Sequence, residues 1–311
     1  MIINKEKNFI SAVVYIHNNE NNIIDTLNNI NNILHNNFEK YEIICVNDYS
    51  TDKSVEQIKK FSIDVKGAVL SILNMSYYQG LELSMGAGVD LAIGDFVFEF
   101  DSVNMDYSPE TIMEVYFKSL KGNDIVSASP KKRMRKSSKL FYDIFNGYSN
   151  NPNKLKTETF RILSRRAINR VQSMNKTIPY RKAIYANCGL KVDTIYYNSI
   201  RNLKIKNVDE TTRKNVAVES LILFTDVAYK AALTMTFVMM LGIIAVGIYT
   251  VKVFISDQPV AGWTTTMLFL SVAFLGVFAI LAVVIKYLSI LVDLTFKKQK
   301  YMIESIEKLT K

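Results

Sequence analysis

The first hundred residues alternate short apolar runs with longer stretches in which apolar residues recur every three or four positions. The runs predict buried strands, and the longer stretches predict amphipathic helices. The predicted strands are residues 9–16, 41–48, 69–73 and 95–101, and the helices between them are residues 21–34, a stretch carrying Val55, Ile58 and Phe61, and residues 81–92. Ser50 or Thr51 is expected to cap the second helix. This order predicts an α/β fold with a mostly parallel sheet and helices on both faces.

The last third of the chain contains two long stretches without a charged residue. One has 21 residues, between Lys230 and Lys252, and the other has 28, between Asp257 and Lys286. A bilayer core requires about 20 helical residues, so each stretch is long enough to span it. This pattern favours a two-helix membrane hairpin over a pair of buried core helices. The polar, Asn-rich N-terminal region does not resemble a signal peptide.

The cations flanking these stretches predict their orientation. Lysine and arginine lie before the first stretch and after the second, whereas the loop at residues 256–262 has neither; the flanking cations are Arg213, Lys214, Lys297, Lys298 and Lys300. Cytoplasmic loops carry such an excess of positive charge, so both ends are expected in the cytoplasm. Residues 211–229 are expected to form an interfacial helix that lies on the bilayer.

Composition narrows the classes of protein. The chain has 311 residues, 49% apolar and 22% charged, which excludes a disordered tail or a small disulfide-stapled module. Cys45 and Cys188 are the only cysteines, too few for a disulfide framework or a cysteine-rich zinc site. A net charge of +9 is compatible with nucleic acid, but no basic and aromatic platform is present, so no nucleic-acid partner is expected.

Polar residues gather after three of the predicted strands. These are residues 17–20 after the first strand, residues 47–52 after the second, and Asp101 with Asp106 after the fourth. In parallel sheets, ligands bind outside the carboxyl ends of the strands. Any one of these loops alone is ordinary turn chemistry. Three acidic loops on one edge can together hold a divalent cation and a nucleotide diphosphate.

Four segments in this order resemble the family 2 glycosyltransferases, which have a Rossmann-like GT-A fold: ISAVVYIHNNENNI, EIICVNDYSTDKS, QGLELSMGAGVDLAIGDFVFEFDS and FRILSRRAINRV. The hairpin and the basic tail with Tyr301 resemble, more narrowly, the bacterial polyisoprenyl-phosphate glycosyltransferases, relatives of dolichol-phosphate mannose synthase. On this resemblance, residues 1–210 are a cytosolic GT-A domain, residues 230–290 two transmembrane helices and residues 291–311 a cytosolic basic tail.

The resemblance also implies an activity. A monosaccharide would pass from a UDP- or GDP-linked sugar to a polyprenyl phosphate, usually undecaprenyl phosphate, for surface glycan modification. Mg²⁺ or Mn²⁺ would bridge the donor diphosphate. The protein would be a multi-pass protein of the bacterial inner membrane, with its catalytic domain in the cytosol, and a homo-oligomer, specifically a tetramer.

Site residues are carried over by the same resemblance. Asp101 matches the first acid of the D-x-D element and is the expected metal ligand and a catalytic residue. Arg161 matches the arginine of the D-F-R-L motif and is the second catalytic candidate. Arg161 and Arg133, from the basic run at residues 131–139, are expected to bind the acceptor phosphate, although the run is equally typical of a solvated or headgroup-facing loop. The expected nucleotide-binding residues are Asn18, Glu20, Asp48, Ser50 and Asp101.

Several positions depart from the family pattern. Asn47 replaces the first acid of the nucleotide loop, Val103 the second acid of D-x-D, and Thr159 the acid before Phe160. Because valine cannot ligate a hard cation, three alternatives stay open. Asp101 holds the metal with the diphosphate and waters, helped by Asn104 or Asp106, or metal dependence is weakened, or the chain is a catalytically degenerate membrane scaffold. A processive synthase is disfavoured, because such enzymes need more spans and a Q-x-x-R-W element.

Overall fold

The structure is a computed structural model. It describes residues 5–131 except residue 66, and residues 136–148, 153–174, 180–200, 262–296 and 301–310, with scattered positions between 217 and 255. Several predictions lie wholly or largely outside the described residues. They are the interfacial helix at residues 211–229, the first uncharged stretch, the loop between the two stretches, and Arg133.

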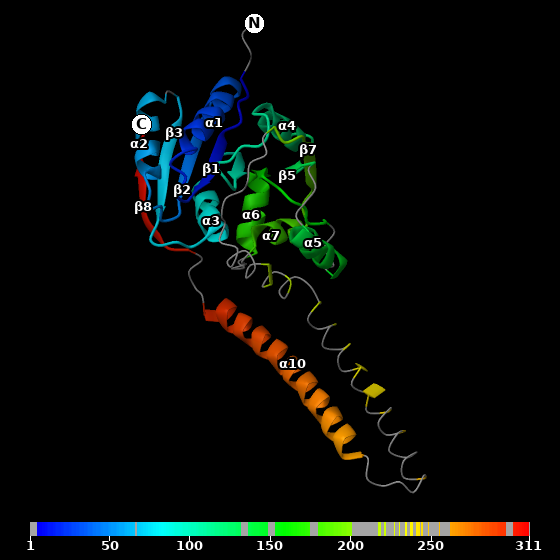
Figure 1. Cartoon of the computed structure of the whole chain (residues 1–311). Helices are drawn as coiled ribbons and strands as arrows, with labels where there is room; N and C mark the ends of the chain where they lie inside the picture. Colours follow the sequence, from blue (N-terminus) through cyan, green and yellow to red (C-terminus); the bar gives the residue numbers. More distant parts are fainter. Residues whose placement is uncertain are drawn as a thin grey trace. The chain divides into compact units, whose positions relative to one another are not determined.

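An eight-stranded sheet forms the centre of the N-terminal unit, with strand order β7-β5-β6-β4-β1-β2-β3-β8 (Figure 1). Its strands are β1 (Ile10–Ile16), β2 (Tyr41–Asn47), β3 (Val69–Met75), β4 (Phe96–Phe100), β5 (Ile125–Pro130), β6 (Phe160–Ser164), β7 (Val192–Tyr197) and β8 (Ile303–Lys308). The helices of this unit are α1 (Ile23–Asn37), α2 (Ser54–Asp64), α3 (Leu81–Leu91), α4 (Glu110–Ser119), α5 (Lys136–Tyr148), α6 (Arg165–Ser173) and α7 (Arg181–Asn187).

The first four strands and three helices confirm the elements predicted from the apolar pattern. β3, β2, β1 and β4 are neighbours and run parallel, so their carboxyl ends lie at one edge of the sheet. The predicted cap of the second helix was wrong. α2 begins after Lys53, and its first N–H, from Ser54, donates to Asp52 Oδ1 at 2.9 Å. Asp52 satisfies this helix end because its short carboxylate reaches an N–H two residues further along the chain.

The sheet as a whole is mixed rather than mostly parallel. β6 runs antiparallel to both β4 and β5, and β7 is parallel to β5. The register of β4 with β6 sets Glu99 opposite Arg161. This pairing places a carboxylate beside a guanidinium in the interior of the sheet.

The last strand comes from the end of the chain. β8 pairs antiparallel with β3 and covers what would otherwise be an open edge. Leu70 N–H donates to Thr310 Oγ1 at 2.6 Å, and Lys59 pairs with Glu307 at 2.7 Å. The basic tail expected at residues 291–311 therefore contains a strand of the central sheet.

Apolar residues pack on both faces of the sheet, as the α/β prediction required. Alternate residues of β1 point to opposite faces, as in any strand. Ala12 and Val14 join a core with α1, α2 and α4, whereas Val13 joins a core with α3, α6 and α7. α3 approaches the sheet closely at Gly88, where a Cβ would lie 2.5 Å from side-chain atoms of Val13 and Val46.

The chain divides into two compact units. The first comprises Met1–Asn146, Asn150–Ser220 and Gln299–Lys311, and the second Gly147–Ser149 and Leu221–Lys298. The second unit contains α10 (Gly262–Phe296), which falls on the second uncharged stretch. We found no helix among the described residues that is both long and apolar enough to cross a membrane.

Candidate active site

The carboxyl ends of β1, β2 and β4 bring five of the predicted site residues to one edge of the sheet. Asn18 and Glu20 follow β1, Asp48 and Ser50 follow β2, and Asp101 follows β4. Because these three strands are adjacent and parallel, residues more than fifty positions apart in the sequence become neighbours. The grouping predicted from the polar loops is the one the fold produces.

The loops after β1 and β2 are tied together by hydrogen bonds. Asn18 N–H donates to Ser50 Oγ at 3.1 Å, and Thr51 N–H donates back to Asn18 Oδ1 at 2.8 Å. Lys53 N–H donates to Glu20 Oε2 at 3.0 Å. Asn18 has a φ of 52°, a left-handed conformation that asparagine tolerates better than most residues. Two predicted nucleotide-binding residues, Asn18 and Ser50, are therefore in direct contact.

Asp48 is fully buried at the base of these loops. Its Oδ1 accepts the Gln79 N–H at 2.8 Å, and its Oδ2 accepts the Gly80 N–H at 2.8 Å and the Tyr15 hydroxyl at 2.9 Å. Burial and the adjacent Asp48 raise the pKa of Tyr15 well above its usual value, so Tyr15 stays a donor. Asp48 thus fixes the turn that leads into α3. Its predicted contact with a nucleotide stays a prediction.

Asp101 belongs to a closed ring of two carboxylates and two guanidiniums. Its Oδ2 accepts from Arg161 and its Oδ1 from Arg181, both at 2.8 Å. The same two arginines also bind the two oxygens of Glu99, which is fully buried; the Arg181 contact is 2.7 Å. Hydrogen bonds between ionised groups such as these are stronger than bonds between neutral groups. The ring fixes the position of the Asp101 carboxylate.

Two further acids complete this cluster. Glu158 accepts from Arg161 Nε at 3.0 Å, and Glu82 accepts from Arg181 Nε at 3.0 Å. Burial alone would raise the pKa of Asp101, but the positive charges of Arg161 and Arg181 outweigh burial and hold that pKa well below its usual range. Asp101 is therefore ionised at neutral pH. The cluster contains four carboxylates and two guanidiniums and so is rich in negative charge.

The geometry of the acids tests the metal prediction. Both oxygens of Asp101 are paired with guanidiniums, and the Val103 side chain is 2% exposed in the core. Asp106 accepts from the Tyr197 hydroxyl at 2.6 Å and the Ser199 hydroxyl at 3.0 Å. In the described part of the chain, no three His, Cys, Asp or Glu side chains are grouped to hold a metal ion. The described donors do not fit a cation held by protein ligands alone.

Each position that departs from the family pattern has a specific partner. Asn47 donates to Asn74 Oδ1 at 2.9 Å, and its own Oδ1 accepts the Ser50 N–H at 3.0 Å. The Thr159 hydroxyl lies against the Tyr197 hydroxyl. The backbone oxygen of Val103 accepts the Thr26 hydroxyl. Asn47 and Thr159 therefore have side-chain partners, whereas the side chain of Val103 packs in the core.

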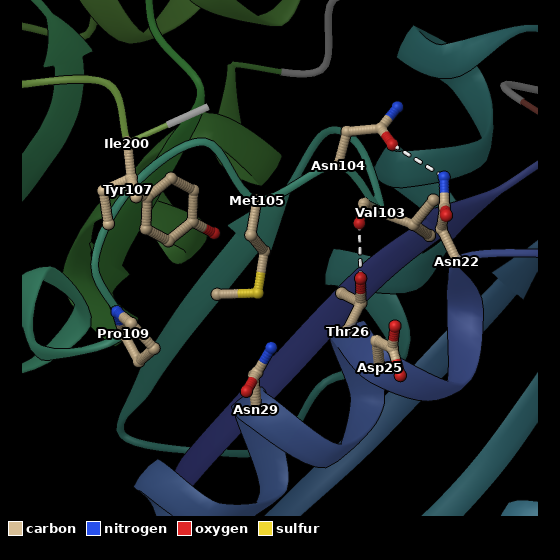
Figure 2. A pocket seen from close by; sticks show the side chains of 10 residues that line it. All are labelled: Asn22, Asp25, Thr26, Asn29, Val103, Asn104, Met105, Tyr107, Pro109 and Ile200. Carbon is tan, nitrogen blue, oxygen red and sulfur yellow. Dashed lines mark hydrogen bonds between the residues drawn. The ribbon is translucent and has the colours of Figure 1, made fainter. Parts of the chain in front are cut away.

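A cavity of about 280 Å³ opens beside the loop that follows β4, between that loop and α1 (Figure 2). One wall carries the amide and carboxylate side chains of Asn22, Asp25 and Asn29, and the other carries apolar side chains such as Met105. Asn22 donates to Asn104 across one end at 3.1 Å. Asn104, the possible helper of Asp101 in the metal prediction, lines this cavity, whereas Asp101, Arg161 and Arg181 do not, so the cavity is distinct from the Asp101 cluster.

The sequence reasoning missed most of the residues that surround Asp101. Arg181 lies eighty residues further along the chain on α7, and Glu99 lies inside an apolar run that predicted only a buried strand. Tyr185, also on α7, donates to Glu99 Oε1 at 2.7 Å. One signal was available: a glutamate within a run of phenylalanines must have a cationic partner if that strand is central. The sequence alone does not identify the partner.

The pattern of these residues agrees with a comparison against family models. Residues 11–174, slightly more than half of the chain, match the model described as Glycosyl transferase family 2. The chain belongs to glycosyltransferase family 2. For this family 2 glycosyltransferase, the matched region begins in β1 and ends just after α6, so it contains Asp48, Asp101 and Arg161 but not Arg181.

Curated relatives of this family 2 glycosyltransferase carry similar names. An "Uncharacterized glycosyltransferase YkcC" of Bacillus subtilis is 24% identical over 94% of this chain and 93% of its own length. An "Uncharacterized glycosyltransferase sll0501" of Synechocystis is 28% identical over 61% of this chain, and the match spans 60% of that protein. A "Prophage bactoprenol glucosyl transferase homolog" of Escherichia coli is 28% identical over half of this chain and 52% of that protein.

Solved structures support the GT-A fold. The mannosyltransferase PcManGT of Pyrobaculum calidifontis, in complex with GDP-Man and Mn²⁺, covers 87% of both chains with a TM-score of 0.50 and 16% identity. Glucosyl-3-phosphoglycerate synthase of Mycobacterium tuberculosis, with Mn²⁺, UDP and phosphoglyceric acid, covers 69% of this chain and 78% of its own, with a TM-score of 0.51 and 13% identity. At these identities the likeness concerns the fold.

Proposed function

We propose that this glycosyltransferase moves a monosaccharide from a UDP- or GDP-linked sugar to a polyprenyl phosphate at the cytoplasmic face of a bacterial inner membrane. The proposal depends mainly on one observation: a GT-A catalytic unit is joined at both ends to an apolar segment with an exposed apolar helix. The name of the E. coli relative, a bactoprenol glucosyl transferase homolog, points to the same class of acceptor.

The exposed surface of α10 supports contact with lipid. Among the described side chains of this helix, ten large apolar ones are exposed: Leu270, Val272, Phe274, Leu275, Val277, Leu281, Val284, Ile285, Leu288 and Leu291. Soluble monomers rarely expose a continuous apolar surface of this extent, and such surfaces commonly mark membrane or protein interfaces. The predicted two-helix hairpin at residues 230–290 therefore stays part of the proposal, as does a homo-tetramer.

Chain connectivity supports an even number of crossings. The chain leaves the catalytic unit near residue 220 and returns to it at residue 299, where it goes on to form β8 in the central sheet. A segment that enters a bilayer and returns to the same folded unit must leave on the side where it entered. Two charge-free stretches would satisfy this condition with two crossings, with the catalytic unit in the cytosol.

The chemistry proposed for the site relies on charge and position. A phosphate monoester has a second pKa of about 6, so the acceptor is already anionic at neutral pH and needs no strong general base. Arg161 is fully buried, so we assign it the role of holding Asp101 in place. A Mg²⁺ or Mn²⁺ ion belongs to the proposal only as a companion of the donor diphosphate, because Mg²⁺ often binds through substrate phosphates and few carboxylates.

A transfer assay tests the proposal. The purified full chain in detergent would receive undecaprenyl phosphate, Mg²⁺ or Mn²⁺, and a panel of UDP- and GDP-linked sugars. We expect one donor to give a lipid-linked monosaccharide, and Asp101→Asn to reduce its formation at least 100-fold. Asp64→Asn, at the end of α2 and remote from the cluster, is the matched control and should keep its activity. No lipid-linked product from any donor would refute the proposal.

A catalytically silent scaffold is the second candidate. The double pairing of Asp101 with arginines and the burial of Val103 favour it, because both oppose a metal site of the expected kind. Titration with nucleotide diphosphates separates the two candidates. Micromolar binding that is lost in Asp101→Ala supports the enzyme, whereas indifference to this substitution supports the scaffold.

A further inference from the structure

One row of polar side chains crosses three neighbouring strands near the candidate active site. Asn47 on β2 is in register with Asn74 on β3, and Asn74 is in register with Ser305 on β8. Asn47 and Asn74 are 7% and 8% exposed, so both amides lie in the interior. Buried amides must be hydrogen-bonded, and these two are bonded to each other, to β8 and to the loop after β2.

The hydrogen bonds of this row run in a defined direction. The amide of Asn74 donates to Ser305 Oγ and to Glu307 Oε1, both at 3.0 Å. Asn74 Oδ1 accepts from Asn47 Nδ2 at 2.9 Å, and Asn47 Oδ1 accepts the Ser50 N–H at 3.0 Å. The path therefore begins in the C-terminal strand and ends on the backbone of the loop after β2.

This path gives a reason for the departure at Asn47. A carboxylate has no N–H, so an aspartate at this position could not donate to Asn74 Oδ1. With Asn74 oriented toward β8 as it is, two acceptors would face each other inside the sheet without a donor, which is costly in a buried position. Asparagine at position 47 is thus matched to asparagine at position 74.

A second set of hydrogen bonds joins the tail to Asp48 by way of Gln79. The side-chain amide of Gln79 donates to the backbone oxygen of Met302 at 2.6 Å and accepts the Met302 N–H at 2.9 Å. The backbone N–H of Gln79 donates to Asp48 Oδ1 at 2.8 Å. The tail is therefore linked to the loop after β2 through Asn74 and Asn47, and it is bonded directly to Gln79 in the turn that Asp48 holds.

We propose that β8 orders the loop at residues 47–54 through Asn74 and Asn47, so that docking of the tail and binding of the donor nucleotide are coupled. Asn47, Asn74 and Gln79 are then positioning residues. The coupling to donor binding rests on the proposed function, whereas the ordering of the loop does not. Because β8 follows the apolar segment at residues 221–298, the loop is linked to the part of the chain proposed to contact lipid.

A reversal of donor and acceptor tests this proposal. Asn74→Asp keeps the acceptor for Asn47 but replaces the donor to Glu307 with a second carboxylate. Adding Glu307→Gln supplies an N–H from the tail, so the contact is restored with opposite polarity. Glu307→Gln alone is the matched control, since it keeps a side-chain oxygen that can accept from Asn74 and removes the exposed ion pair with Lys59. Hydrogen exchange of the full chain in detergent reports the loop and the tail separately.

In Asn74→Asp we expect exchange at residues 47–54 and 302–308 to rise together at least tenfold, with β4 and β6 unchanged. The double variant should return both segments to within twofold of wild type. UDP or GDP should bind Asn74→Asp at least fivefold more weakly, and the tighter-binding nucleotide should slow exchange of the wild-type tail, because coupling is reciprocal.

Faster exchange in the tail alone, with the loop unchanged, would overturn the proposal, as would failure of the double variant to restore the loop. Exchange measured without nucleotide tests the ordering of the loop by β8 separately from the proposed function. If the wild type binds neither UDP nor GDP, the proposed function fails, and the exchange of the loop still decides whether β8 orders it.

Discussion

Removing the Arg161 guanidinium should destabilise the catalytic unit strongly. Arg161 is fully buried and pairs with Glu99, Asp101 and Glu158. Arg161→Met keeps the volume of the stem but leaves two of the buried carboxylates with one arginine instead of two. Breaking a buried ion pair by removing one partner costs about 3–5 kcal/mol, so we expect a loss near 4 kcal/mol. For a unit of this size that loss lowers Tm by about 10 °C.

Arg166→Met is the matched control, because it removes a nearby arginine, in the first turn of α6, that has a very different environment. Its side chain is 75% exposed and lies 3.9 Å from Asp124. Exposed ion pairs contribute about 0–1 kcal/mol, so this variant should unfold almost like wild type. The assay is urea unfolding of the full chain in detergent followed by circular dichroism. Tryptophan fluorescence is unsuitable, since the single tryptophan, Trp263, lies in α10.

The quantity to compare is the free energy of unfolding of Arg161→Met and of Arg166→Met. A gap of about 3 kcal/mol or more agrees with a closed, buried ring around Asp101. If the free energy of unfolding of Arg161→Met falls by less than about 1 kcal/mol, water takes the place of the guanidinium, and the reasoning from buried charge is refuted. Glu99→Gln should then also be mild, because the same water would reach it.

Three further outcomes are expected. Because the folded pKa of Asp101 is depressed, its contribution to stability is present above about pH 4 and is lost as pH falls toward the folded value. In urea unfolding, the free energy of unfolding should therefore change with pH more steeply in wild type than in Asp101→Asn, by up to about 1.4 kcal/mol per pH unit, and equal slopes would contradict this. Burial raises the pKa of the Cys45 thiol to about 12, so mass spectrometry should find it unlabelled by a thiol reagent at pH 8 until urea unfolds the chain; rapid labelling of the folded protein would contradict its burial. Gly88→Ala should destabilise by about 1–3 kcal/mol in the same unfolding assay, because the added methyl meets two valine side chains at 2.5 Å, whereas Gly86→Ala on the same helix has no atom within 4 Å and should not.

The first half of the fold could be predicted because its signals are local. Each strand from β1 to β4 is an apolar run bounded by polar loops, and each helix between them repeats its apolar residues at helical spacing. The order of such elements restricts the sheet to parallel neighbours, and that alone collects Asn18, Asp48 and Asp101 at one edge. This part of the site follows from topology.

The rest of the site depends on pairings between distant segments. Arg181 reaches Asp101 from a seven-residue helix whose sequence gives no sign of its target. β8 has the sequence IESIEK, in which charged residues outnumber apolar ones, and it is a strand because β3 offers it an open edge. The sequence therefore predicted the acids at the sheet edge and singled out Arg161, but it predicted neither Arg181 nor the pairing of β8 with β3.

The position of β8 has a consequence for how the protein is made. β8 follows both β3 and the apolar segment at residues 221–298 along the chain, so it is synthesised after them. Until β8 has been synthesised, β3 keeps unpaired backbone groups at an edge where another chain could add. A chain whose translation has not yet reached β8 is therefore exposed to aggregation at this edge, and a variant truncated before residue 303 would keep the edge open.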